Sequence, residues 1–426
     1  MHMNSTSVVL IFDIGKTNKK LFLFNEAYQL VHEISDQFAE IQDEDGFACE
    51  DLIALSDWIQ ASIVSIQQNQ AFNIKGIHYS AYGASFVYLD QDKKPILPLY
   101  NYLKPLKAST QEQFELKYGS MEQMSLATAS PFLGNLNSGL QLYRMKVEQP
   151  EKFSKIKWAL HLPQYIHFLI TGQLASDITS IGCHTMLWNF TENKYHDWVI
   201  QEGLDQILPS TQSEVGLHDS SSALIPYLSS FAEPFVLIST GTWCISLNPF
   251  NDSILTTDEL KQDTLCFLSY TGKPVKASRL FSGKEHEQAV LLLNKHFNKP
   301  DNYYTKVKYD ASIPLDLVAN SFVPSDYSDF ETAYHCLVAR LVKKQISSTN
   351  LLIATTKVNR IFVDGGFSHN ELFMNLLAKS YSEFEVFAAA IPQASALGAA
   401  LAVHHKWNTK SIPNNLISLQ YYSTRN

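Results

Sequence analysis

The sequence predicts an α/β protein made of two related halves, with mixed sheets that carry helices on both faces. Two observations support this prediction. Short apolar strands alternate with amphipathic helices along most of the 426 residues. A strand–turn–strand pattern at residues 8–24 also returns at residues 235–247, with its glycine 226 positions later (241 − 15). Two such hairpins, each opening an α/β half, indicate a duplicated domain.

The elements of the first half follow from the spacing of apolar residues. Short apolar runs predict buried strands, and apolar residues three and four positions apart predict helices. The predicted strands are 8–12, 19–24 and 74–79, and the predicted helices are 51–67 and 138–170. Pro150 and Pro163 are expected to break the second helix, because proline cannot donate the helical hydrogen bond.

The second half repeats this order after a connection marked by Pro226, two serines and Pro234. The predicted strands are 235–238, 243–247, 360–363 and 386–387, and the predicted helices are 329–349, 369–381 and 394–404. We therefore expect two domains, an N-terminal one over 1–228 and a C-terminal one over 229–426.

The composition is that of an ordinary globular protein. Hydrophobic residues make up 45% and charged residues 18% of the chain, which excludes a disordered or low-complexity protein. The net charge of -9, without a run of basic residues, argues against nucleic acid as the main partner. No apolar stretch reaches the ~18 residues of a membrane span, so no membrane partner is expected. The first residues lack the features of a signal peptide. We expect a cytoplasmic protein and leave a homodimer open.

The five cysteines are scattered and never form a C-x-x-C pair; they are Cys49, Cys183, Cys244, Cys266 and Cys336. Free, buried thiols in a reducing compartment are the expected state. A zinc site is not predicted, because the sequence shows no cluster of ligands.

Two turns carry residues suited to binding metal and phosphate. Asp13 ends the first strand and is placed to hold Mg²⁺ through water. Gly15 lets backbone amides approach a phosphate, and Thr17 and Asn18 offer donors. Residues 239–242 form a similar turn in the second half, and the two turns together would bind phosphate from both sides. They are called the first and the second hairpin tip below. Plain turns are the alternative in both places.

A glycine pair follows the predicted strand at 360–363. Such a pair in Asp364-Gly365-Gly366 lets a flat ring or a ribose lie against the backbone, although a simple turn is an equal alternative. Asn370, in the first turn of the next predicted helix, is placed to reach the same ligand.

Asp219 is the candidate general base. It lies in the block 218–223, just before the connection between the halves, where a helix is predicted to begin. Phosphoryl transfer to an alcohol needs a carboxylate within hydrogen-bond reach of the attacking hydroxyl. An aspartate that only caps the helix is the alternative, and spacing alone favours it.

These motifs, in this order, resemble the FGGY family of carbohydrate kinases. The motifs are Asp-x-Gly-x-Thr at 13–17, Gly-x-His-Asp-x-x-x-Ala at 216–223, Ser-Thr-Gly-Thr-Trp at 239–243, Asp-Gly-Gly-Phe-Ser-x-Asn at 364–370 and a small-residue helix at 394–400. The second and third motifs are most similar to the rhamnulokinase branch. The resemblance implies duplicated actin/hexokinase-like (ribonuclease H-like) domains. It also implies transfer of the γ-phosphoryl group of ATP to a small ketose, such as an L-rhamnulose- or L-fuculose-like deoxyketose or a pentulose.

The resemblance further implies a role for each matching position. Asp219 would deprotonate the acceptor hydroxyl, and Asp13 would organise Mg²⁺. The residues implied to bind ATP are Gly15, Lys16, Thr17, Asn18, Thr240, Gly241, Thr242, Gly365, Gly366 and Asn370. The residues implied to bind the sugar are Tyr82, Gly83, Ala84, Asn101, Tyr102, His218 and Asp219.

The sequence departs from the family pattern at residues 100–105, which read Tyr-Asn-Tyr-Leu-Lys-Pro. Many members carry an aspartate and an arginine there, so neither the sugar nor the phosphorylated hydroxyl is predicted. The tyrosines suit an apolar sugar face or a methyl group, or they are packing residues only. A non-catalytic sugar or nucleotide sensor and a sugar-independent ATPase are the alternative functions.

Residues 282–286 are not explained by these motifs, and they are either a surface loop or a contact on the nucleotide side. Lys16 is expected to help hold phosphate, whereas Lys19 and Lys20 are expected to be charges on the face of the strand.

Overall fold

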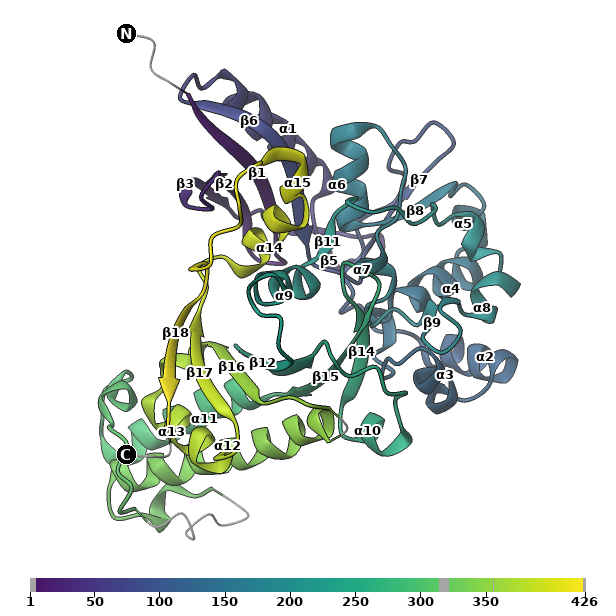
Figure 1. Cartoon of the computed structure of the whole chain (residues 1–426). Coiled ribbons are helices and arrows are strands. Elements are labelled where there is room, and N and C mark those ends of the chain that lie inside the picture. Colours follow the sequence, from purple (N-terminus) through teal and green to yellow (C-terminus); the bar gives the residue numbers. More distant parts are fainter. Residues whose placement is uncertain (1–4, 314–321, 355, 424–426) are drawn as a thin grey trace.

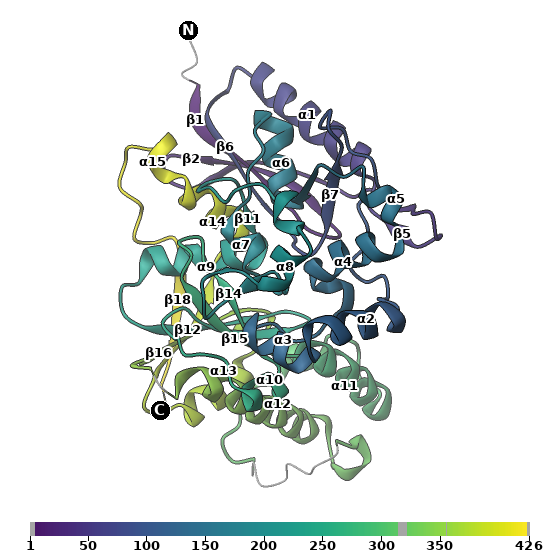
Figure 2. The same cartoon turned by 90° about the vertical axis from the view of Figure 1, so that its right-hand side faces the viewer.

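The structure is a computed structural model that describes residues 5–313, 322–354 and 356–423. Two mixed β-sheets lie in separate parts of the molecule and are covered by helices (Figure 1). Turning the molecule shows the two parts one above the other, with helix α9 (Asp219–Ser230) between them (Figure 2). The predicted fold class, α/β with mixed sheets, is confirmed.

The first sheet has the strand order β11-β6-β1-β2-β3. Its strands are β1 (Thr6–Ile14), β2 (Lys19–Asn25), β3 (Leu30–Asp36), β6 (Phe72–Ala81) and β11 (Leu217–His218). β1 is antiparallel to β2 and parallel to β6, which is in turn parallel to β11. The carboxyl ends of β1, β6 and β11 therefore meet at one edge of the sheet.

Both faces of the first sheet are buried, because side chains of β1 alternate between two hydrophobic clusters. Val8, Leu10 and Phe12 belong to the cluster with α1 (Leu52–Gln68) and α6 (Leu162–Thr171). Val9 and Ile11 belong to the cluster with α14 (Ala394–Ala402) and α15 (His404–Trp407). A strand buried on both faces needs apolar side chains at every position, which explains its unbroken apolar run.

The second sheet has the order β14-β15-β13-β12-β16-β17-β18. Its strands are β12 (Phe235–Thr240), β13 (Cys244–Asn248), β14 (Thr264–Leu268), β15 (Pro274–Leu280), β16 (Arg360–Gly365), β17 (Glu385–Ala390) and β18 (Ser418–Tyr422). β12 is antiparallel to β13 and parallel to β16, as β1 is to β2 and β6. One face packs on α11 (Ser282–Phe297), α12 (Phe330–Ile353) and α13 (Glu371–Ser380), and the other packs on α9.

Shorter elements form a third hydrophobic cluster, on the right in Figure 1. They are β7 (Phe86–Leu89), α2 (Ala108–Tyr118), α3 (Met121–Ala127), α4 (Ser138–Glu148), α5 (Pro150–Phe153), β8 (Trp158–His161), α7 (Ile178–Ile181), β9 (Trp188–Asn189), β10 (Lys194–Tyr195) and α8 (Asp197–Gln201). The remaining short elements are β4 (Ile41–Gln42), β5 (Ala48–Cys49) and α10 (Thr257–Lys261).

The prediction of one broken helix over 138–170 is wrong in its middle. The segment holds α4, α5, the strand β8 and α6, and β8 pairs antiparallel with β7. Pro163 does not break a helix but lies in the first turn of α6, where a helix tolerates a missing N–H. A strand of four residues is too short to be distinguished from a helix by its apolar pattern.

Helices α14 and α15 lie against the first sheet, although their residues fall in the predicted C-terminal domain. α14 crosses α9 so closely that a Cβ on Gly398 would lie 1.8 Å from the carbonyl oxygen of Ser222. Pro226 in α9 has no N–H to donate to that carbonyl, so the Cα of Gly398 can approach it. The boundary between residues 228 and 229 stays a prediction, and the chain returns to the first sheet after it.

The state of the cysteines agrees with the expectation from the sequence. All five cysteines lie in described parts of the chain, where they are buried and form no disulfide. Among the described helices, none has the length and apolar character needed to cross a membrane.

We expect Gly398→Ala to destabilise the protein, because the added methyl group would overlap a backbone oxygen that cannot rotate away. Overpacking of this kind costs ~3 kcal/mol, which denaturation followed by circular dichroism would measure. Gly76→Ala is the matched control, since a Cβ there would lie 3.4 Å from the Cβ of Trp407, an ordinary contact. Equal stability of the two variants would show that α9 and α14 do not pack this closely.

Candidate active site

Parallel strands of the first sheet end at the candidate catalytic residues. In register, Asp13 of β1 lies beside Ser80 of β6, and Ala81 of β6 lies beside His218 of β11. Asp219 follows directly as the first residue of α9. The carboxyl edge of parallel strands is where α/β proteins usually bind ligands. Both candidate carboxylates lie at this edge.

Asp13 is a largely buried carboxylate held by α14. Burial raises the pKa of Asp13 to about 6, although the hydroxyl of Ser395 donates a hydrogen bond of 2.6 Å to Oδ2. The negative charge of Asp219 contributes to the same rise. Two carboxylates that repel each other in a buried place are stabilised by a cation, and oxygen ligands suit Mg²⁺. The metal role of Asp13 stays a prediction that these surroundings fit.

Asp219 does not act as the cap of α9. The cap position belongs to His218, and Asp219 Oδ1 accepts hydrogen bonds from the N–H and the hydroxyl of Ser220, at 2.6 and 3.3 Å. The Asp219 side chain is 39% exposed and lines a cavity of about 340 Å³. These contacts give no support to the capping alternative, and they leave the carboxylate accessible to a ligand.

The cavity beside Asp219 lies between the two halves and is called the acceptor cavity below. Its lining includes Cys183, His184 and Asp219 from the first half, and Ser239, Asp364 and Ser395 from the second. Residues from the ends of β12, β16 and α14 thus face the start of α9 across one space.

The first hairpin tip, which is the turn between β1 and β2, is held in place by the side chain of Lys19. The N–H of Gly15 donates to the carbonyl of Asn18 at 2.9 Å, and the Lys19 ammonium donates to the carbonyls of Gly15 and Lys16 at 3.2 and 3.0 Å. Lys19 also forms a buried ion pair with Glu50. The expectation of a strand-face charge is therefore wrong, because only 3% of this side chain is exposed.

The side chains at this tip contact exposed neighbours or solvent. Lys16 forms an ion pair with Glu40 at 2.7 Å, and Asn18 accepts a hydrogen bond from Gln37 at 2.7 Å. Thr17 is exposed. Exposed pairs of this kind are weak and easily exchanged for a ligand. The predicted phosphate contacts of these residues stay predictions.

The second hairpin tip, which lies between β12 and β13, is hydrogen-bonded to the turn after β16. Within the tip, the N–H of Gly241 donates to the carbonyl of Trp243 at 2.9 Å. The hydroxyl of Thr240 donates to the carbonyl of Asp364 and accepts from the N–H of Phe367 at 2.9 Å. One hydroxyl therefore fixes the two turns of the second half that were predicted to bind ATP.

Two glycines let other backbone segments meet this tip. A Cβ on Gly283 of α11 would lie 1.8 Å from the carbonyl oxygen of Gly241. A Cβ on Gly365, whose φ is +76°, would lie 1.9 Å from the carbonyl oxygen of Thr240. Residues 282–286 form the first turns of α11 against the tip, so the surface-loop interpretation of this segment is wrong.

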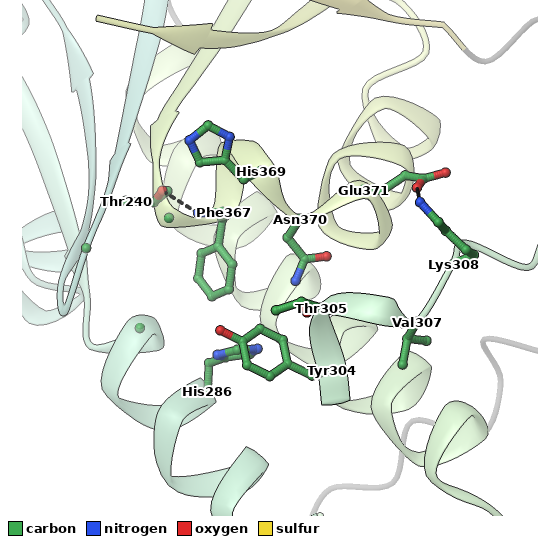
Figure 3. Close-up of a pocket in the computed structure, with 13 residues that line it drawn as sticks. Thr240, His286, Tyr304, Thr305, Val307, Lys308, Phe367, His369, Asn370 and Glu371 are labelled. Carbon is green, nitrogen blue, oxygen red and sulfur yellow. Dashed lines mark hydrogen bonds and ion pairs between the residues drawn. The ribbon is translucent and has the colours of Figure 1, made fainter. Parts of the chain in front are cut away.

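A second cavity, of about 330 Å³, opens beside the second tip and is called the nucleotide cavity below (Figure 3). Of the residues predicted to bind ATP, it is lined by Thr240, Gly241, Gly366 and Asn370. Thr242 and Gly365 adjoin these residues in the chain without belonging to the lining.

Aromatic rings form one wall of the nucleotide cavity. The ring of Phe367 points toward His286 and Tyr304 (Figure 3) and meets His286 edge-on at 5.3 Å. On its other side Phe367 stacks on Phe373 at 4.6 Å, which fixes its position. A flat apolar wall of this kind suits the ring of a nucleobase.

Polar groups fix the rest of this cavity. Asn370 caps α13, and its amide donates to the hydroxyl of Tyr334 at 2.7 Å. The same hydroxyl lies 3.0 Å from Nε2 of His286, whose pKa is lowered by burial to about 4. An ion pair between Lys308 and Glu371, at 3.0 Å, lies at the edge of the cavity (Figure 3).

Several residues predicted to bind sugar are engaged within the protein. A Cβ on Gly83 would lie 2.4 Å from the imidazole of His218, so Gly83 packs directly on that ring. The buried Tyr82 donates its hydroxyl to Glu50 at 2.6 Å. Asn101 uses both ends of its amide to hold backbone groups of its own loop and of β5.

The ring of Tyr102 lies 6.1 Å from that of Tyr82, and burial and the charge of Asp219 raise the pKa of Tyr102. Ala84 has a positive φ of 65°, and its carbonyl accepts a hydrogen bond from Gln141. Of the residues predicted to bind the sugar, His218 and Asp219 line the acceptor cavity and Gly83 packs on the ring of His218, whereas Tyr82, Ala84, Asn101 and Tyr102 do not belong to the lining.

The sequence analysis did not single out several residues of the two cavities. His286 and Tyr304 lie far from the motifs, although the unexplained segment 282–286 contained one of them. Ser395 lies in the small-residue helix at 394–400, and the sequence does not show that its hydroxyl contacts Asp13. Cys183 and His184 adjoin in sequence, but the residue that completes their group, His218, is distant.

Comparison with known proteins matches both halves to one family. Residues 8–207 match the N-terminal domain of the FGGY family of carbohydrate kinases, and residues 232–311 match the C-terminal domain of FGGY carbohydrate kinases. A rhamnulokinase from Halalkalibacterium halodurans is 26% identical over 262 residues, covering 54% of this chain and 52% of that protein. A xylulose kinase from Bacillus subtilis is 25% identical over 334 residues, covering 75% of this chain and 62% of that protein.

A solved structure agrees over nearly the whole chain. The ligand-bound xylulose kinase from Lactobacillus acidophilus is similar with a TM-score of 0.81 at 15% identity, covering 98% of this chain and 94% of that one. A likeness at this identity establishes the fold, and it confirms the duplicated actin/hexokinase-like architecture. Since models of both domains match in order and the fold agrees, the chain belongs to the FGGY family of carbohydrate kinases.

Proposed function

We propose that this protein transfers the γ-phosphoryl group of ATP to a hydroxyl of a small ketose. The observation that carries the proposal is the position of the accessible Asp219 carboxylate in the acceptor cavity, next to the nucleotide cavity. Successive residues of β12 line the two spaces, Ser239 the first and Thr240 the second. At the end of β16, Asp364 lines the first space and Gly366 the second. A γ-phosphate between them would face Asp219.

The reaction needs a base, a donor held in place and compensation of charge. A ketose hydroxyl would donate a hydrogen bond to Asp219 and pass its proton to that carboxylate as its oxygen bonds to the γ-phosphorus. The bond to the β-phosphate oxygen would break, and ADP would leave. Asp13 would hold Mg²⁺, which supplies positive charge to the phosphates. Closure of the two halves on α9 would exclude water from the transfer.

The acceptor is proposed to be a deoxyketose of the L-rhamnulose or L-fuculose type, or a pentulose. The pKa of Tyr102 is raised by burial and by the charge of Asp219, and its aromatic face suits an apolar sugar face or a methyl group. The relatives named above are a rhamnulokinase and a xylulose kinase, so both sugar classes are candidates.

ADP release from ATP, measured with and without each sugar, tests the proposal. The panel is L-rhamnulose, L-fuculose, the ribuloses, the xyluloses and glycerol. The expected result is Mg²⁺-dependent ADP release with one ketose and little without sugar. Hydrolysis at the same rate without sugar would instead identify an ATPase, and ATP binding without any turnover would identify a sensor.

We expect Asp219→Asn to lower kcat by about 10³-fold, because the amide cannot accept the proton of the attacking hydroxyl. The Kd of ATP, measured by calorimetry, should remain within a factor of about three, since Asp219 lies outside the nucleotide cavity.

Ser229→Ala serves as the control, because it removes an exposed hydroxyl near the far end of the same helix, α9, and leaves the carboxylate and its neighbours in place. Its kcat should stay close to that of the unmodified protein. Near-normal turnover of Asp219→Asn would remove Asp219 from the role of base.

We expect Thr240→Ala to weaken ATP binding about tenfold, since its hydroxyl ties the second tip to the turn after β16. Thr240→Ser keeps that hydroxyl and should bind ATP nearly as well as the unmodified protein. Calorimetric Kd values without sugar measure both variants. Equal affinities for the alanine and serine variants would contradict a role for this link in holding the nucleotide.

A further inference from the structure

Cys183, His184 and His218 bring three metal-binding atoms together at the wall of the acceptor cavity. The Sγ atom of Cys183 lies 2.8 Å from Nδ1 of His184 and 3.5 Å from Nε2 of His218. All three atoms lie within 4.8 Å of one another. The sequence analysis predicted no such cluster, because His218 is 35 positions from Cys183 and joins it through the start of α9.

The thiol of Cys183 contacts both imidazoles of this cluster. It can donate its one proton to one imidazole nitrogen and accept a hydrogen bond from the other, so all three atoms can act as donors of electron pairs once their protons are released. Cys183 and His218 are buried, with 7% and 4% of their surface exposed, so water contributes little. The thiolate is the form of cysteine that binds metals.

His218 is oriented to present Nε2 to the cluster. Its Nδ1 has no hydrogen-bond partner within bonding distance, and Oδ1 of Asp219 lies 3.5 Å from it. A carboxylate behind a ligating imidazole keeps the proton on the far nitrogen and leaves the near nitrogen free for a metal. The backbone N–H of His218 also donates to the hydroxyl of Thr179 at 2.9 Å, which fixes the residue.

We propose that Cys183, His184 and His218 are the ligands of a divalent transition-metal ion of the zinc type. Two imidazole nitrogens and one thiolate suit Zn²⁺ and disfavour Mg²⁺, which requires oxygen ligands. Three protein ligands leave one tetrahedral position open, as in zinc sites that bind a substrate or water. The open position faces the acceptor cavity, because all three residues line it.

The metal site is distinct from the Mg²⁺ position proposed for Asp13. A divalent ion with one thiolate and two neutral imidazoles would add a net positive charge to the wall of the cavity that Asp219 also lines. The inference goes beyond the proposed kinase reaction and does not require it. A measurement of metal binding therefore tests it separately from turnover.

The test uses the whole protein, stripped of metal with a chelator and kept reduced with a phosphine. Co²⁺ is titrated in the presence of excess Mg²⁺, and absorption is recorded. The expected result is saturation at an equimolar ratio, with a thiolate-to-cobalt charge-transfer band that Zn²⁺ abolishes by displacement. No saturable binding, or binding without that band, would overturn the proposal.

Three variants locate the ligands. Cys183→Ala should lose the band, and His184→Ala, at a half-buried position that tolerates change, should weaken Co²⁺ binding by at least ~100-fold. Cys336→Ala is the matched control, because this buried cysteine lies on α12, across the second sheet from the cluster. A band kept by Cys183→Ala, or lost equally by Cys336→Ala, would contradict the site.

Failure of the metal site and failure of the kinase proposal are distinguishable. A protein that phosphorylates a ketose but binds no Co²⁺ contradicts only the metal site. A protein that binds Co²⁺ through Cys183 but turns over no sugar contradicts only the kinase.

Discussion

The close crossing of α9 and α14 is the contact on which the arrangement of the site depends. Pro226 leaves the carbonyl of Ser222 without its helical donor, and Gly398 approaches that carbonyl more closely than any residue with a Cβ allows. The same packing brings Ser395 of α14 to Asp13, while Asp219 stands at the start of α9. One helix–helix contact therefore links both carboxylates, although Asp13 belongs to β1 and Asp219 to α9, and Asp13 is held from the other half of the chain.

The net charge of -9 repels the phosphates of ATP, so the proposed binding of ATP needs local groups that attract them. Both hairpin tips offer backbone amides, which hold phosphates without adding net charge. The ammonium of Lys19 is used internally, against Glu50 and two carbonyls of the tip, so it shapes the tip. At the second tip, the backbone at Gly283 and Gly365 packs closely against the carbonyls of Gly241 and Thr240 and thereby shapes the tip. In both halves, contacts with neighbouring parts of the protein thus fix the geometry of the tip.

The sequence allowed the strands and the carboxylates to be predicted, but not their partners. The apolar run of β1 and the spacing of α1 follow from burial, which leaves a regular pattern in the sequence. β8 was missed because four residues carry too little pattern. The carboxylate Asp13 ends a strand and is visible as a turn motif, whereas its contact with Ser395 depends on how α14 crosses the molecule. The contact between Cys183 and His218 could not be predicted either, because tertiary packing brings together two residues that are 35 positions apart.

His218 takes part in both sites that are proposed for the acceptor cavity. Its ring stands between Sγ of Cys183, at 3.5 Å from Nε2, and the carboxylate of Asp219, at 3.5 Å from Nδ1. Gly83 packs against the ring so closely that a Cβ would lie 2.4 Å from it. A ligand bound at Cys183 would therefore contact the imidazole that also faces the carboxylate of Asp219. The orientation of the proposed base is in this way tied to what occupies the acceptor cavity.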